Sequence, residues 1–147
     1  MSLVRQSFDC GELPDLDARL REGLREQLAR DQLPAGSTVA IGVGSRGVSP
    51  IVEVVQVLVD ELQSAQLQPF IVPAMGSHGG GTAQGQTTVL KDYGVVEETV
   101  GAPIRATMDT VELGDTSDGI TGYLDAAAAS ADRVIVIGRV KPQTGFR

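Results

Sequence analysis

The chain has 147 residues, 41% of them hydrophobic, and a formal net charge of -7. This length and hydrophobic content suffice for one ordinary domain with a sizeable core that needs neither disulfides nor a structural metal. The acidic balance and the scarcity of aromatic residues exclude broad binding to a nucleic-acid backbone and serial stacking of bases.

Cys10 is the only cysteine, so neither an intramolecular disulfide nor a cysteine-based zinc cluster can form. No segment approaches the roughly 20 consecutive apolar residues of a membrane helix, and the N-terminus lacks the basic-then-apolar layout of a signal peptide. We therefore expect a cytoplasmic protein in a reducing compartment, with neither membrane nor nucleic acid among its partners.

The first part of the chain alternates predicted strands and helices. A short strand is predicted around Leu3–Phe8, and leucines recurring every fourth position predict an amphipathic helix: Leu16, Leu20, Leu24 and Leu28. The apolar run Thr38–Ile41 is typical of a buried parallel strand. Ser49 followed by Pro50 predicts the start of a helix, because a serine side chain can cap an unpaired backbone N–H and proline has no backbone N–H to leave unpaired. This helix should run to about Ala65.

The order of strand, glycine-rich loop and helix is predicted a second time. Pro69–Pro73 is the strand, Met75–Gly81 the loop, and Thr82 caps a helix that ends near Tyr93 and Gly94.

The remaining segments are less regular. Strands are predicted at Pro103–Met108, Gly119–Leu124 and Arg133–Ile137, with a short helix at Asp125–Ala131. Helices that alternate with apolar strands predict a Rossmann-like, three-layer α/β fold with a mainly parallel sheet and helices on both faces. We expect one domain over residues 1–147.

Two loops share one layout: Gly44-Ser45-Arg46-Gly47 and Gly76-Ser77-His78-Gly79. Glycine lets a backbone approach a ligand closely, and each loop precedes a helix N-terminus, which favours an anion. Tight turns that bind nothing use the same residue types. A third polar loop, Arg139–Arg147, follows the last predicted strand. Because ligands of open α/β sheets gather where strands end, these loops predict a phosphate or carboxylate site.

The basic residue differs between the two loops. Arg46 is suited to gripping a carboxylate or phosphate with two hydrogen bonds, the alternative being a solvated surface arginine. His78 is the only histidine, and because imidazole titrates near neutrality it suits a general acid or base, the alternative being an exposed loop residue. A lone histidine cannot build a usual metal site, so no metal ligand is predicted.

Two other functions fit less well. Gly42–Gly47 satisfies the G-x-G-x-x-G dinucleotide pattern, but the second strand ends Val72-Pro73 without the acidic residue that binds ribose. A serine nucleophile elbow needs glycine two residues before Ser45, where Val43 stands.

Three segments resemble the N-terminal domain of the lactate racemase family: Gly44–Gly47, Pro69–Gln86 and Arg139–Phe146. The resemblance runs from Thr38 to Arg147, and the N-terminal helix matches in general character. Members of that family are nickel-dependent racemases and epimerases of 2-hydroxy acids and related compounds. They use a nickel-pincer nucleotide, which accepts a hydride and returns it to the other face.

The resemblance implies that Arg46 binds the substrate carboxylate and that His78 removes or returns the hydroxyl proton. It implies contacts to the cofactor and its phosphate from Gly44, Ser45, Gly47, Ser77, Gly79, Gly80 and Thr82. The lysine that bonds the cofactor and the histidine that ligates nickel belong to the family's C-terminal domain, which would begin after Arg147. The implied partner is a hydroxy acid or similar carboxylate. Whether a C-terminal domain or a second copy of the chain joins it is left open.

The sequence departs from the family pattern at two positions. The second catalytic histidine would fall in a Lys-Pro-His segment, where this chain has Lys141, Pro142 and Gln143. Glutamine is no general base, so the chain is inactive, acts on another substrate or depends on Lys141. Val43 stands where the family often has an aspartate. The alternative function is a non-catalytic module that binds an anion or nucleotide.

Overall fold

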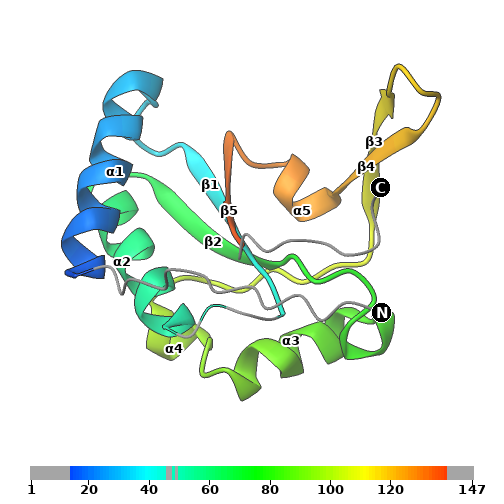
Figure 1. Cartoon of the computed structure of the whole chain (residues 1–147), viewed down its shortest axis with the longest axis horizontal. Helices are drawn as coiled ribbons and strands as arrows, with labels where there is room; N and C mark the ends of the chain where they lie inside the picture. Colours follow the sequence, from blue (N-terminus) through cyan, green and yellow to red (C-terminus); the bar gives the residue numbers. More distant parts are fainter. Residues whose placement is uncertain (1–13, 46–47, 49, 139–147) are drawn as a thin grey trace, which may run out of the picture.

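The computed structural model describes residues 14–45, 48 and 50–138. At its centre lies a parallel sheet in the order β2–β1–β5, formed by β1 (Thr38–Val43), β2 (Gln68–Pro73) and β5 (Arg133–Ile137). Val43 at the end of β1 is in register with Pro73 on one side and with Ile137 on the other. All three strands therefore end at the same edge of the sheet (Figure 1).

Helices cover both faces of this sheet. They are α1 (Leu16–Asp31), α2 (Ile51–Ser64), α3 (Ala83–Asp92), α4 (Glu97–Val100) and α5 (Ala126–Ala129). Successive side chains of a strand point to opposite faces, and accordingly Ile41 packs with α2 and with Leu90 of α3, whereas Ala40 and Phe70 pack with Ala128 of α5. The predicted three-layer α/β fold is confirmed. None of the described helices is both long and apolar enough to cross a membrane.

Most predicted elements lie within one or two residues of their expected bounds. β1, β2, β5, α1, α3 and α5 are confirmed. α2 begins one residue later than predicted, with Pro50 in the N-cap position and no side-chain hydrogen bond to cap it. Ser49, the predicted cap, and the strand predicted at Leu3–Phe8 lie outside the described residues.

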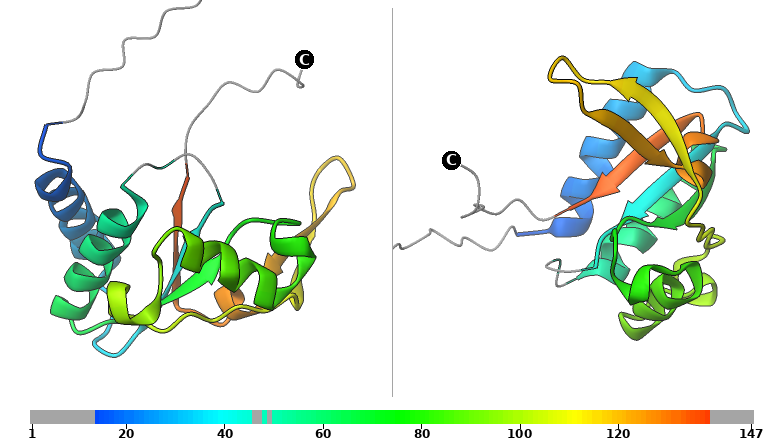
Figure 2. Two further views of the ribbon diagram at one scale, coloured as in Figure 1. Left: turned by 90° about the horizontal axis from the view of Figure 1, so that it is seen from below. Right: turned by 90° about the vertical axis from the view of Figure 1, so that its right-hand side faces the viewer.

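The strand predicted at Gly119–Leu124 is confirmed as β4 (Thr121–Asp125), but the segment between α4 and β4 differs from the prediction. Pro103–Met108 is not a strand; a single parallel bridge joins Ile104 to Ile71. A strand that was not predicted, β3 (Thr110–Asp115), pairs antiparallel with β4 (Thr121–Asp125), and the hairpin projects from the side away from α1 (Figure 2). Every residue of β3 is exposed, so pairing rather than burial defines this strand, and a burial pattern does not reveal it.

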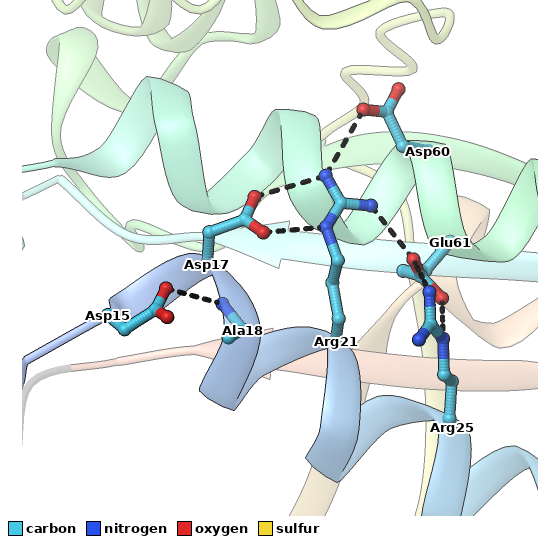
Figure 3. A network of polar contacts seen from close by, with 7 residues as sticks. All are labelled: Asp15, Asp17, Ala18, Arg21, Arg25, Asp60 and Glu61. Carbon is cyan, nitrogen blue, oxygen red and sulfur yellow. Dashed lines mark hydrogen bonds and ion pairs between the residues drawn. The ribbon is translucent and has the colours of Figure 1, made fainter.

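An ion-pair network joins α1 to α2 (Figure 3). Glu61 of α2 is only 6% exposed, and its carboxylate accepts hydrogen bonds from Arg25 at 2.6 Å and Arg21 at 2.8 Å. Arg21 also pairs with Asp17 one turn earlier. The hydrogen bonds from Arg25 and then Arg21 lower the pKa of Glu61, and they outweigh the opposing effect of burial. A buried carboxylate with two guanidinium partners therefore fixes how α1 lies on α2.

Replacing Glu61 with Gln should destabilise the protein at pH 7 by about 1.5–3 kcal/mol, the range for a hydrogen bond to a charged group. The folded pKa of Glu61 is lowered, so its contribution is present above the unfolded pKa and is lost as the pH falls through the folded pKa. Urea unfolding from pH 7 to pH 3 should show the two proteins converging in acid. Glu53→Gln, at an exposed position of the same helix, is the control and should change the free energy of unfolding little. A difference in unfolding free energy between wild type and Glu61→Gln that stays constant with pH would contradict the account.

Candidate functional site

The two glycine loops meet at the edge where β1 and β2 end. Gly44 and Ser45 follow β1, and the second loop follows β2. The Oγ of Ser45 lies 2.8 Å from Nδ1 of His78. Since carboxyl ends of adjacent parallel strands share an edge, the pairing of β1 with β2 explains why residues 33 positions apart in the chain make contact.

The surroundings of Nδ1 fix the form of the His78 ring. Nδ1 also lies 2.8 Å from the carbonyl oxygen of Met75. A carbonyl oxygen only accepts hydrogen bonds, so Nδ1 must carry a proton, which it shares between Met75 and Ser45. In the neutral ring, Nε2 then holds the lone pair. This arrangement suits a general base that acts through Nε2, and it excludes activation of Ser45 as a nucleophile at Nδ1.

Glycines shape the second loop in two different ways. Gly79, Gly80 and Gly81, the turn η1, have φ of 63°, 69° and 64°, a left-handed run that other residues rarely adopt. Gly79 also touches the backbone of Gly85 in α3: a Cβ on Gly85 would lie 1.7 Å from the Gly79 carbonyl oxygen. Gly79 is therefore required by packing and by φ, whereas a Cβ on Gly80 would meet nothing within 4 Å.

Polar contacts from α3 hold this loop in place. Thr82 caps the helix as predicted, its Oγ1 accepting a hydrogen bond from the Gly85 amide at 3.0 Å. The side-chain amide of Gln86, which is 4% exposed, donates to the carbonyl oxygen of Gly76 at 2.7 Å. The loop that carries His78 is thus supported by the first turn of α3.

The hydroxyl of Tyr93, directly after α3, donates a hydrogen bond to the carbonyl oxygen of Ser45. Sequence reasoning gave no role to Tyr93, Gln86 or Gly85. Gln86 falls in the segment that resembles the racemase family, which was a usable signal. The sequence around Tyr93 gave no signal of its role beyond marking the end of a helix, because its partner, Ser45, is distant in the chain.

The structure describes part of the predicted site. Ser77, His78, Gly80 and Thr82 are exposed, while Gly44, Ser45 and Gly79 are partly buried. Four predicted residues lie outside the described ranges: Arg46, Gly47, Lys141 and Gln143. β5 ends beside β1, at the same edge as the two glycine loops. Within the described part of the chain, no group of three or more His, Cys, Asp or Glu residues is placed to hold a metal ion.

Comparison with known proteins identifies the family of this chain. A family model described as the lactate racemase N-terminal domain matches residues 17–146. The match includes both glycine loops, the segment leading into α3 and most of the third loop. Neither the curated proteins nor the solved structures contain a match.

Gly85→Ala should destabilise the protein by about 1–3 kcal/mol, as overpacking usually does, because the new methyl group would overlap the Gly79 carbonyl. Gly23→Ala is the matched control: it lies in the interior of α1, where an added Cβ meets nothing within 4 Å. That change should stabilise by about 0.5–1 kcal/mol. Thermal unfolding should show a lower melting temperature for Gly85→Ala and a higher one for Gly23→Ala. Equal changes in melting temperature would refute the close contact between Gly85 and Gly79.

Proposed function

Because this chain belongs to the lactate racemase N-terminal domain family, we propose that it supplies half of the active site of a nickel-pincer-nucleotide-dependent racemase or epimerase. The substrate is a 2-hydroxy acid or a related compound. The observation that carries this proposal is the contact of Ser45 with His78 across the two glycine loops. The contact joins the family's motif residues at the edge of the sheet where ligands bind.

His78 is the acid/base group of this half-site. Its Nδ1 is occupied by Met75 and Ser45, and the side chain is exposed, so Nε2 is available to a ligand. A neutral imidazole with a free Nε2 takes the proton from the hydroxyl group of a bound hydroxy acid, and the resulting imidazolium returns it. A racemase needs proton transfer on both faces of its substrate, and we assign the second face to Lys141 or to a group outside this chain.

The residues at the edge fit a phosphate. Gly44 has a φ outside the left-handed region, and a Cβ there would make only ordinary contacts with the described residues, at 3.6 Å or more. Neither the backbone conformation nor contacts with the described residues therefore require glycine at this position. Close approach of a ligand is a reason for it. The N-terminus of α3, preceded by Gly79, Gly80 and Thr82, adds amides and a positive dipole end. We assign the cofactor phosphate to these groups together with Gly47 and Ser77.

The described residues do not fit the nickel end of the cofactor, since they place no cluster of metal ligands. When bound, the cofactor supplies a hydride acceptor. The role we give this chain is to bind the phosphate, to orient the substrate through the Arg46 guanidinium, and to move one proton at Nε2 of His78. Arg46 is assigned to the substrate carboxylate because arginine matches that group with two parallel hydrogen bonds.

Titration calorimetry of the chain with pyridine dicarboxylic acid mononucleotide tests the proposal. The mononucleotide should bind, and NAD should bind more weakly. The mononucleotide carries carboxylates as well as a phosphate, so Arg46→Ala should weaken its binding roughly tenfold or more, as loss of a charged hydrogen bond does. Arg19→Ala, on the exposed surface of α1, is the control and should leave the affinity unchanged. Absence of binding, or equal binding of NAD, would contradict the proposed site.

A further inference from the structure

We propose that Tyr93 is a positioning residue that sets the orientation of His78 through Ser45. Ser45 is held on two sides: its Oγ contacts Nδ1 of His78, and its carbonyl oxygen accepts the hydrogen bond from the Tyr93 hydroxyl. Tyr93 therefore does not touch the reacting atoms but fixes the residue that does contact the imidazole. The consequence for catalysis rests on the proposed function, whereas the consequence for the histidine ring does not.

The helix α3 gives Tyr93 a fixed starting point. Leu90, three residues before it, and Val95, two residues after it, are both 0% exposed in the core. The Tyr93 amide donates to the Leu90 carbonyl, and Gly94 ends the helix with a φ of 81°. The tyrosine side chain therefore extends from an anchored backbone, so its hydroxyl acts on the first loop from a defined place.

α3 consequently connects the two loops through its two ends. Its first turn holds the loop of His78, through Gly85 against Gly79 and through Gln86 bonded to Gly76. Its far end holds the loop of Ser45 through Tyr93. One short helix thus sets the spacing between the loops, and loss of the Tyr93 hydroxyl would release one of them without disturbing the core.

The carbonyl that Tyr93 binds belongs to the peptide bond that leads into Arg46. Because a peptide unit is planar, a hydrogen bond to its oxygen restrains the whole unit. We therefore expect the phenol to affect both the histidine, through the Ser45 hydroxyl, and anion binding, through the backbone of Gly44 and Ser45.

The single histidine makes the test direct. A long-range ¹H–¹⁵N spectrum of the full chain, recorded on the neutral imidazole, should show the Nδ1–H form. Tyr93→Phe should shift the Nδ1 signal away from its wild-type value, because the Ser45 hydroxyl, one of the two acceptors of the Nδ1 proton, is no longer held in place. Tyr123→Phe changes the other tyrosine, which lies on the exposed hairpin, and should leave the spectrum as in the wild type.

A double variant shows whether Tyr93 acts through Ser45. Ser45→Ala should shift the ring nitrogens in the same direction, and adding Tyr93→Phe to it should produce little further change. Amide signals of Leu90 and Val95 that stay in place show that the fold is retained. A Tyr93→Phe spectrum that overlays the wild type, or additive shifts in the double variant, would overturn the proposal.

Mononucleotide affinity separates this inference from the proposed function. Tyr93→Phe should weaken binding roughly two- to tenfold, the range for loss of one hydrogen bond. If the wild type binds no mononucleotide, the proposed function fails, while the histidine spectrum still decides whether Tyr93 positions the ring. If the mononucleotide binds equally well to both proteins, the inferred effect on anion binding is wrong.

Discussion

The parallel pairing of β1 with β2 is the constraint on which the site depends. The register places Val43 opposite Pro73, and the Ala74 amide donates to the Val43 carbonyl at 2.8 Å, which extends the pairing one residue beyond the strands. Both strands are almost wholly buried, so the cores on the two faces specify this register. The contact between Ser45 and His78 follows from this register, because the two glycine loops begin where the paired strands β1 and β2 end.

The glycines of the two loops serve different purposes, although their sequence pattern is the same. Gly79 is fixed by its contact with Gly85, and Gly80 and Gly81 by their left-handed conformation. Gly44 has neither a left-handed φ nor a close contact with the described residues. The serines differ as well: Ser45 contacts the imidazole, while Ser77 is exposed beside it. A repeated motif has thus produced one loop that carries His78 and another whose serine contacts the imidazole.

The sequence predicts those parts of the fold that burial determines. β1, β2 and α2 have continuous or periodic apolar patterns, and the edge shared by the loops follows from their alternation with helices. β3 was missed because none of its residues is buried. The link between Tyr93 and Ser45 was missed because it joins positions 48 residues apart and depends on where α3 ends. Arg46, Lys141 and Gln143 were predicted from the motifs alone and remain predictions.

The central claim is that His78 moves a proton for a racemase or epimerase whose phosphate and carboxylate sites lie on these loops. It is tested most directly by measuring epimerisation of a 2-hydroxy acid in a protein that joins this chain to the family's C-terminal half and carries the nickel-pincer nucleotide. His78→Ala should lower the rate roughly 100- to 10,000-fold, the usual contribution of a general acid or base. An unchanged rate would remove His78 from the mechanism and contradict the account.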